Sequence, residues 1–257
     1  MRITFRDNDN KSYWKNRWTN IEADMPMTNL DKYPLKFSNL IINDKKQIIL
    51  EAGCGAGRIL RYYHELKYNI IGIEFIKEAV DKLKVVDNSL KVEVGNILDL
   101  RFNDDYFDVI LAFGLYHNFE KKNLDKALTE TYRVMKKGAK ICASFRADNI
   151  QELIVDYIRK NKNSKNSHFH KLNLKKKEFI DLFKKHNFNI EKVHSVQNMP
   201  FLYKFKIFRS KEQKEFNENV ARAEGYRLSI IGNFLQGFLI KFFPDHFCNI
   251  YLIIAEK

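Results

Sequence analysis

The feature that most constrains this chain is a short apolar run that ends in closely spaced glycines. Residues 48–58 have the sequence IILEAGCGAGR, in which Gly53, Gly55 and Gly57 alternate with other residues. An apolar run that stops at a glycine is typical of a buried parallel strand. Glycine allows a tight turn and the close approach of a ligand, and a helix that starts there presents free N–H groups. The segment therefore predicts a strand, a ligand-binding loop and a helix.

Strand-like and helix-like patterns alternate along the rest of the chain. Short apolar runs predict seven strands, at residues 47–51, 69–75, 90–94, 107–113, 140–145, 189–196 and 248–255. Apolar residues at helical spacing predict helices at residues 58–67, 76–86, 123–135, 149–160 and 178–188. This alternation predicts an α/β, Rossmann-like fold, with a seven-stranded, mostly parallel sheet and helices on both faces. Gly138 is expected to end the helix at residues 123–135.

Two segments fall outside the predicted sheet. Residues 1–40 show no strand pattern, although Tyr13, Trp14 and Trp18 have helical spacing, and they predict an N-terminal cap segment. About fifty residues separate the last two strands, whereas an ordinary hairpin connection has roughly 2–5. This aromatic-rich stretch predicts an inserted substrate lid at residues 199–246. The core domain then consists of residues 41–198 and 247–257, with the polar stretch 161–177 as an exposed loop.

The charges around the glycine loop favour a cationic ligand. A dinucleotide-binding loop has a third glycine where this chain has Arg58. Glu51 precedes the loop, where it would repel a pyrophosphate and attract a cation. Glu74 ends the second strand, about 20 residues after the first glycine, which is the spacing at which a carboxylate reaches ribose hydroxyls. S-adenosylmethionine carries a sulfonium and an ammonium group and no phosphate, so these residues favour it over NAD.

Residues 47–145 resemble the class I S-adenosylmethionine-dependent methyltransferases, particularly their small-molecule branch. The sequence EAGCGAG resembles the first family motif, and Glu74 matches the residue that holds the cofactor ribose. The sequences GNILDL at residues 95–100 and FDVILAFGLYH at residues 107–117 resemble the third and fourth motifs. Residues 130–138 and 178–196 are similar to later family elements, in the same order.

The resemblance implies S-adenosyl-L-methionine as cofactor and S-adenosyl-L-homocysteine as product. The implied cofactor-binding residues are Tyr13, Trp14, Glu51, Gly53, Cys54, Gly55, Gly57, Arg58, Glu74, Phe75, Asn96, Ile97 and Phe113. Family members usually have aspartate where Asn96 stands, but an amide oxygen also accepts a hydrogen bond from the adenine amino group. The alternatives are a turn residue for Asn96, surface carboxylates for Glu51 and Glu74, and plain helix packing for the N-terminal aromatic residues.

His117 is the expected catalytic residue. It follows the fourth strand, at the edge of the sheet where ligands of open parallel sheets bind. Histidine titrates near neutrality, so it suits a general base for a hydroxyl acceptor. The alternative is a structural histidine that caps the next helix. The expected substrate residues are Tyr116, Arg222, Tyr226 and Arg227, polar groups in an aromatic background, with plain packing of the aromatic side chains as the alternative.

Composition restricts the other classes. The formal net charge is +13, which favours nucleic acid or acidic partners unless it reflects scattered surface lysines. The three cysteines are widely spaced, and His168 and His170 lack a third ligand nearby, so no metal site is expected. No apolar run reaches the roughly 18 residues of a membrane span, and the N-terminus lacks the apolar core of a signal peptide, so a cytoplasmic protein is expected. The apolar stretch 229–243 predicts burial within the protein or a homodimer interface.

The sequence therefore predicts a methyltransferase that acts on a small-molecule acceptor, chiefly at oxygen, such as a sugar, a lipid-linked intermediate or a secondary metabolite. The sequence AFGLYH stands where amino methyltransferases of DNA bases have an Asn-Pro-Pro-Tyr type motif. One alternative is an RNA-directed methyltransferase, which the net charge and the basic stretch 159–177 motivate. Another is a non-catalytic cofactor-binding subunit, against which the intact glycines and Glu74 argue.

Overall fold

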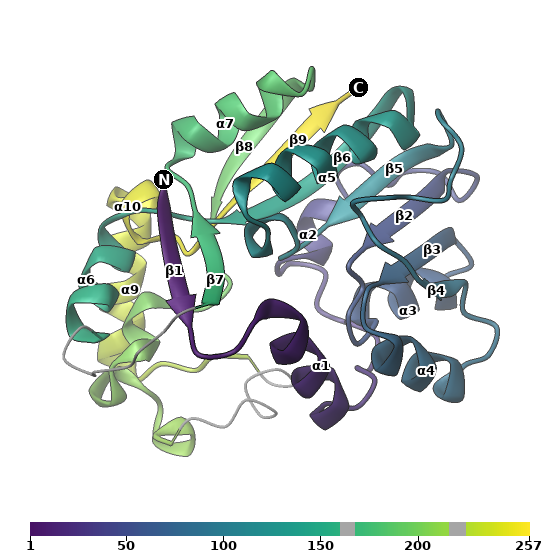
Figure 1. Cartoon of the computed structure of the whole chain (residues 1–257). Helices are drawn as coiled ribbons and strands as arrows, with labels where there is room; N and C mark the ends of the chain where they lie inside the picture. The colour runs from purple at the N-terminus through teal and green to yellow at the C-terminus, as the bar shows by residue number, and fades with distance from the viewer. Residues whose placement is uncertain (160–167, 216–224) are drawn as a thin grey trace.

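The computed structural model describes residues 1–159, 168–215 and 225–257 (Figure 1). The strands are β1 Arg2–Arg6, β2 Ile48–Ala52, β3 Asn69–Glu74, β4 Val92–Val94, β5 Phe107–Ala112, β6 Met135–Arg146, β7 His168–Asn173, β8 Asn189–Val196 and β9 Ile250–Glu256. The α-helices are α1 Asn10–Asn20, α2 Leu35–Ser38, α3 Arg58–Glu65, α4 Lys77–Val86, α5 Lys121–Val134, α6 Ile150–Arg159, α7 Lys176–Lys185, α9 Ile230–Phe242 and α10 Pro244–Phe247. Single 3-10 turns form η1 Tyr116–Asn118, η2 Phe201–Lys204, η3 Lys206–Phe208 and η4 Lys211–Gln213.

Seven strands form the main sheet, in the order β4-β3-β2-β5-β6-β9-β8. All neighbours are parallel except β9, which runs antiparallel to β6 and β8. The chain leaves β2 toward β3 on one side and later returns to β5 on the other, so the order reverses beside β2. Ligands of open α/β sheets bind at such a reversal, outside the carboxyl ends of the strands. The structure confirms the predicted Rossmann-like sheet.

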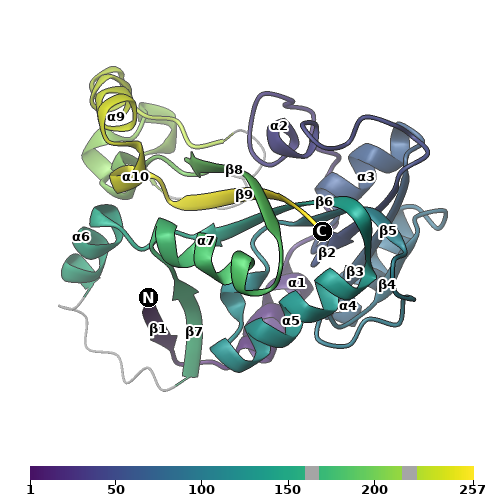
Figure 2. The same cartoon turned by 90° about the horizontal axis from the view of Figure 1, so that it is seen from above.

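Helices cover both faces of this sheet, as the view from above shows (Figure 2). One core contains side chains of α5 and α7, and the other contains side chains of α2, α3 and α4. Helix α5 shows why the periodicity predicted these elements: Leu124, Leu128 and Thr131 recur at helical spacing and are buried. The prediction that Gly138 ends this helix is wrong. The helix ends at Val134 because β6 begins at Met135, and Gly138 lies inside β6 with φ +77°.

A separate two-stranded sheet was not predicted. Strand β1 lies in the cap segment, where no strand was expected, and it pairs antiparallel with β7. Strand β7 lies in the stretch 161–177, which was expected to be an exposed loop. Both strands are short, and each forms only because the other one is there, more than 160 residues away in the sequence. A local pattern cannot reveal such a pairing.

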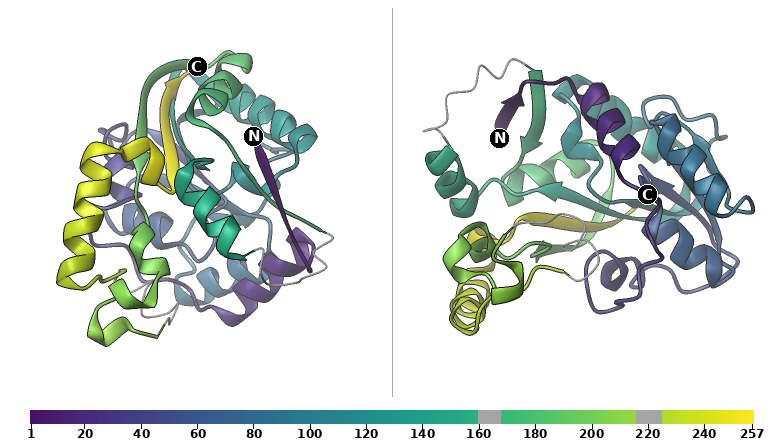
Figure 3. Two further views of the ribbon diagram at one scale, coloured as in Figure 1. Left: turned by 90° about the vertical axis from the view of Figure 1, so that its left-hand side faces the viewer. Right: turned by 90° about the horizontal axis from the view of Figure 1, so that it is seen from below.

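The aromatic stretch after β8 packs beside helix α6. Phe201, Leu202, Tyr203 and Leu228 form a cluster with Val155 of α6. Helix α9 follows, and it stands at the periphery of the molecule (yellow, Figure 3). The prediction that residues 229–243 are buried within the protein is wrong for one face of this helix, because Ile230 is 90% and Phe234 is 75% exposed. A homodimer interface there stays a prediction. Among the described residues, no helix is both long enough and apolar enough to cross a membrane.

Candidate functional site

The glycine loop lies between β2 and α3, at the carboxyl end of the central strands. Gly53, Gly55 and Gly57 have φ values of +71°, +56° and +83°, a backbone region that side chains disfavour. The backbone N–H groups of Gly53 and Cys54 donate to the carbonyl oxygen of Ile73, at 2.9 and 3.0 Å. A β-carbon on Gly57 would lie 2.4 Å from a methyl group of Leu83. The loop therefore needs glycine both for its turn and for the approach of helix α4.

Glu74 holds the loop from the end of β3. Its Oε2 accepts the N–H of Gly55 and its Oε1 accepts the N–H of Ile76, both at 3.0 Å. Burial raises the pKa of Glu74, and the backbone hydrogen bonds oppose that rise. Each carboxylate oxygen keeps a second lone pair, so both oxygens can still accept a hydrogen bond from a ligand. The carboxylate is therefore fixed in place and still able to bind a pair of hydroxyl groups.

Glu51 lies near the end of β2, beside the same loop, and one of its carboxyl oxygens lacks a hydrogen-bond partner among the described residues. Its side chain is buried, and Oε2 has no hydrogen-bond partner in the part of the chain that the structure describes. Burial raises the pKa of Glu51 to about 8, although nearby Arg58 opposes the rise. Buried polar atoms in folded proteins are nearly always paired. The unpaired oxygen therefore indicates that a cationic or hydrogen-bond-donating ligand completes this site.

Helix α1 covers the loop with a tryptophan. The ring of Trp18 packs on Gly55 so closely that a β-carbon there would lie 2.7 Å from the ring atom Cζ2. Trp14 stacks on Trp18, with ring centroids 5.7 Å apart. Lys82 of α4 donates to the carbonyl oxygens of Trp18, Thr19 and Ile21 at 2.8–2.9 Å and so binds the end of α1. The view from below shows α1 (purple) beside α4 (blue) in Figure 3.

His117 lies in η1, just after β5, on the other side of the sheet reversal. It is 8% exposed, and its Nδ1 atom has no hydrogen-bond partner among residues 1–159, 168–215 and 225–257. Burial lowers the pKa of His117 well below its usual value, and the nearby side chains of Arg146, Lys171 and His170 lower it further. The imidazole is therefore neutral at pH 7, with a nitrogen free to exchange a proton.

Comparison with known proteins finds a family match for the part of the chain that contains the glycine loop. Residues 50–143 match the protein family described as "Methyltransferase domain". Residues 50–143 therefore have the sequence pattern of a methyltransferase domain. A putative methyltransferase of Encephalitozoon cuniculi is 28% identical over 98 residues, covering 38% of this chain and 44% of that protein. An uncharacterized methyltransferase of Anoxybacillus flavithermus is 22% identical over 103 residues, covering 40% of this chain and 49% of that protein. The matched part of the chain thus spans about half the length of these curated relatives.

Solved structures share the fold over nearly the whole chain. A methyltransferase of Archaeoglobus fulgidus that depends on S-adenosylmethionine superposes with a TM-score of 0.59 and 18% identity, covering 97% of this chain and 100% of that one. One of Methanosarcina mazei gives a TM-score of 0.61 and 17% identity, covering 89% and 99%. These neighbours support the fold of the methyltransferase domain and of the elements around it.

The residues of the methyltransferase domain fit S-adenosylmethionine. Glu51 offers an unpaired buried oxygen to an ammonium or sulfonium group, and Glu74 offers two fixed oxygens to ribose hydroxyls. Arg58 lies near Glu51, at the start of α3, where a carboxylate is favoured by the helix N-terminus. No phosphate-binding residue is needed for this ligand.

Three other predicted cofactor residues are aromatic, and each contacts a different neighbour. Phe75 follows Glu74 and is half exposed. The centroid of its ring lies 5.8 Å from the ammonium group of Lys11 in α1. Tyr13 stacks against Arg6 instead, with the guanidinium carbon 3.6 Å from the ring centroid. Phe113 packs edge-on against Tyr33, with ring centroids 5.5 Å apart.

Asn96 forms a turn after β4, as in the alternative to its predicted cofactor contact. The Oδ1 atom of Asn96 accepts the N–H of Leu98 at 3.0 Å, and the backbone oxygen of Asn96 accepts the N–H of Asp99. Ile97 is buried in the core under the sheet. Cys54 is also buried, and burial raises the pKa of its thiol well above the usual value, so it packs as a small apolar side chain.

Three of the four predicted substrate residues lie in the described part of the chain. Tyr116 is fully buried, and its hydroxyl group pairs with Thr131 at 2.7 Å, and a contact between Tyr116 and the substrate stays a prediction. Tyr226 packs against Tyr203, with ring centroids 5.0 Å apart, and Arg227 is exposed. Arg222 lies outside the described residues. Within the described ranges, no group of three His, Cys, Asp or Glu residues is placed to hold a metal ion.

Trp18 packs on the glycine loop, and the sequence did not single it out for this contact. Its helical spacing with Trp14 pointed to a cap, but only Tyr13 and Trp14 were assigned to the cofactor. In the structure, the ring of Trp18 contacts Gly55 of the glycine loop. Spacing alone cannot say which turn of a helix meets a loop that lies 37 residues away in the sequence.

Proposed function

We propose that this protein transfers the methyl group of S-adenosylmethionine to a small-molecule acceptor, chiefly to a hydroxyl group. The observation that carries the proposal is the buried, unpaired carboxyl oxygen of Glu51 beside three glycines of positive φ. A cationic cofactor satisfies that oxygen and lowers the free energy of the complex relative to the free protein. Glu74 holds the ribose, and Arg58 pairs with the cofactor carboxylate.

The surroundings of the loop favour transfer over hydrolysis. S-adenosylmethionine supplies an electrophilic methyl group when it is bound. Trp18 and Trp14 cover the glycine loop, and Lys82 binds the last turn of α1, so this side of the cofactor is shielded from water. A protein contributes to a displacement reaction mainly by holding the two reacting groups in position, and residues that bind both the cofactor and the acceptor would supply that contribution here.

His117 is the proposed general base. The unpaired Nδ1 of the neutral ring accepts the proton of the acceptor hydroxyl group as the oxygen attacks the methyl group. The lowered pKa keeps the ring unprotonated at pH 7, at the cost of a weaker driving force for proton transfer. We propose sugars, lipid-linked intermediates and secondary metabolites as the acceptor classes, since all three present hydroxyl groups.

A transfer assay tests this proposal. The full chain is incubated with methyl-labelled S-adenosylmethionine and, separately, with a panel of sugars, uronic acids and sugar phosphates or with total RNA. Label is expected in a small-molecule product and absent from RNA, and Glu74→Ala is expected to abolish it. Label in RNA alone would replace the small-molecule proposal with the nucleic-acid alternative.

A further inference from the structure

Hydrogen bonds within the turn and from the sheet hold the segment that carries His117. Asn118, the next residue, folds its side-chain amide back and donates to the carbonyl oxygens of Gly114 and Leu115, at 2.8 and 3.0 Å. The N–H of Gly114 donates to the hydroxyl oxygen of Ser144 in β6, at 2.9 Å. The first two bonds close the turn on itself, and the third one fixes the start of the turn to the main sheet.

A further hydrogen bond reaches the same turn from helix α1, outside the main sheet. The side-chain amide of Asn10, the first residue of α1, donates to the backbone oxygen of Asn118 at 2.7 Å. Asn118 directly follows His117, so this bond fixes the backbone one residue beyond the imidazole. One amide group thus joins two segments that are 108 positions apart in the sequence.

Arg6 orients the amide group of Asn10. Arg6 is the last residue of β1, and its guanidinium group donates to the Oδ1 atom of Asn10. An amide carries its acceptor and its donors on separate arms, so the contact with Arg6 leaves the Nδ2 arm of Asn10 for the backbone oxygen of Asn118. The side chain of Asn10 therefore has a partner on each arm and a defined orientation.

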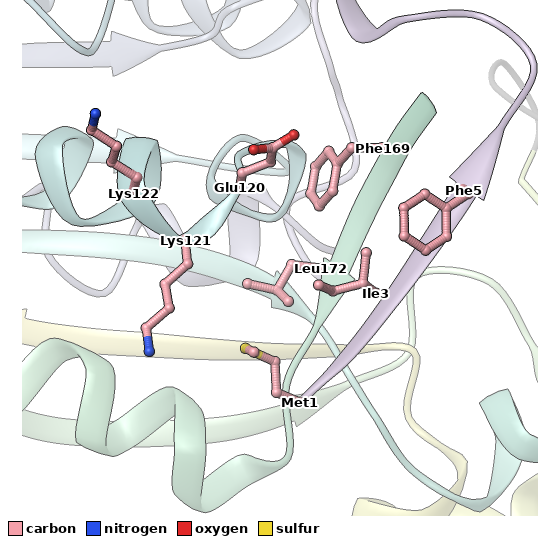
Figure 4. A pocket seen from close by; sticks show the side chains of 8 residues that line it. All are labelled: Met1, Ile3, Phe5, Glu120, Lys121, Lys122, Phe169 and Leu172. Atoms are coloured by element: carbon pink, nitrogen blue, oxygen red, sulfur yellow. The ribbon is translucent and has the colours of Figure 1, made fainter. Parts of the chain in front are cut away.

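The two-stranded sheet places Arg6 for this contact. Arg6 follows Phe5 in β1, and Phe5 is opposite Phe169 of β7. Phe5 and Phe169 line one open cavity together with Glu120, the residue before α5, so the small sheet lies beside the start of that helix (Figure 4). Helix α5 follows η1 directly in the chain. The pairing of β1 with β7 therefore brings the start of α1 to the turn that carries the proposed base.

One face of α1 reaches from this turn to the glycine loop. Asn10, Trp14 and Trp18 recur at every fourth position, so they lie on the same face of the helix. Asn10 contacts the turn, and the ring of Trp18 contacts Gly55. These two contacts are separated by about 12 Å along the helix axis. Helix α1 is therefore a single rigid element that touches both the cofactor loop and the turn of His117.

We propose that Asn10 is a positioning residue for methyl transfer, because its amide couples helix α1, which covers the cofactor loop, to the turn that carries His117. The proposal rests on the function proposed above and adds a residue that acts through the base. Asn10 acts without touching the reacting atoms. Its hydrogen bond keeps the turn, and with it the buried imidazole, in one position relative to the cofactor.

The alternative is that Asn10 only fastens the start of α1, and the two roles differ in what the loss of the amide changes. If Asn10 holds the whole helix in place, its loss detaches α1 from the glycine loop and weakens cofactor binding. If Asn10 holds the turn, cofactor binding is kept, because Lys82 still binds the other end of α1 through three carbonyl oxygens. Only the position of His117 then changes.

Chemical modification of His117 in the ligand-free chain tests the proposal without a methyl acceptor. Diethyl pyrocarbonate acylates accessible, unprotonated imidazole groups, and the buried, neutral His117 is expected to react slowly in the wild type. Asn10→Leu keeps a side chain of similar volume without the donor, and Asn10→Ala removes both. Each variant is expected to raise the rate at His117 about tenfold, the effect of one lost hydrogen bond on local opening. The exposed His246 is the internal reference in the mass spectrum.

Asn20→Ala is the matched control, because the amide of Asn20 donates to a backbone oxygen within the same helix, that of Asn16, at 2.9 Å. This variant is expected to leave the rate at His117 unchanged. Calorimetry is expected to give affinities for S-adenosylhomocysteine within twofold of the wild type in all three variants. In the transfer assay, the two Asn10 variants are expected to lower kcat about tenfold and to leave the KM for S-adenosylmethionine unchanged.

An unchanged modification rate at His117 in both Asn10 variants, or an equal increase in Asn20→Ala, would overturn the proposal. Loss of affinity for S-adenosylhomocysteine in both Asn10 variants would also overturn it, since Asn10 would then hold the whole helix rather than the turn. A wild-type chain that does not bind S-adenosylhomocysteine would instead refute the cofactor assignment. The modification rates would still decide whether Asn10 holds the turn of His117.

Discussion

At the scale of single residues, the sequence predicted which carboxylates flank the glycine loop, but it did not predict their burial or their protonation. Glu51 and Glu74 were assigned from their spacing to Gly53, and both are at the loop. The sequence could not show that Glu51 is buried, because its surroundings come from α3, β3 and β5 together. Burial gives this residue the raised pKa of about 8 and so makes its behaviour depend on pH.

Glu51→Gln is predicted to weaken binding of S-adenosylhomocysteine by about tenfold to a hundredfold, because the buried amide cannot balance the ammonium group of the ligand. The ligand-free variant is predicted to be more stable than the wild type at pH 7. The folded-state pKa of Glu51 is raised from 4.5 to about 8, so the wild type loses stability as pH rises through this range.

Titration calorimetry and thermal unfolding at pH 6, 7 and 8 check both parts of this prediction. In the wild type, affinity for the ligand is expected to rise toward pH 8, since binding requires Glu51 to release its proton. A wild-type affinity that does not change with pH, together with an unchanged melting temperature in the variant, would place the carboxylate outside the cofactor site.

His117→Ala is predicted to lower kcat about a hundredfold or more and to change the affinity for S-adenosylhomocysteine less than twofold. Transfer rates and calorimetry measure the two quantities. In the wild type, the lowered pKa keeps the ring neutral down to pH values well below 6.5, so protonation of His117 is not expected to reduce the rate at pH 6.5. Full activity of the variant would exclude His117 as the base.

At the scale of elements, local periodicity predicted the strands and helices of the main sheet, and it failed where pairing is non-local. The strand at residues 189–196 and the helices that contain Leu124 and Phe179 were correctly placed, because their own apolar faces require a core. Strands β1 and β7 were missed because each has only a few residues and becomes a strand by pairing with the other. The two faces of this small sheet depend on this pairing, so the sequence could not show them.

Trp18→Ala is predicted to weaken cofactor binding about tenfold, because the ring of Trp18 is the part of α1 that contacts the glycine loop. Asn16→Ala, at an exposed position of the same helix, is the matched control and is expected to leave the affinity unchanged. Calorimetry with S-adenosylhomocysteine compares the two variants. Equal affinities would show that α1 only packs against α4 and does not close the cofactor site.

At the scale of the whole molecule, the net charge of +13 includes cationic side chains that do not simply face solvent. Arg146 and Lys171 lie near His117, and Lys204 lies 3.4 Å from the buried carboxylate of Glu152. The sequence could not distinguish these lysines from surface ones, because the sequence alone does not show burial. The exposed apolar face of α9 is a second whole-molecule feature: this face is not buried within the protein, and a homodimer interface there stays a prediction.

The central claim is that the glycine loop with Glu51 and Glu74 binds the cofactor of a methyltransferase. Titration of S-adenosylhomocysteine into the full chain at pH 8, close to the pKa of Glu51, tests it most directly. One equivalent is predicted to bind with micromolar affinity, and Glu74→Ala is predicted to weaken that binding about tenfold or more. No measurable binding by the wild-type chain at millimolar ligand, or equal binding by Glu74→Ala, would contradict the claim.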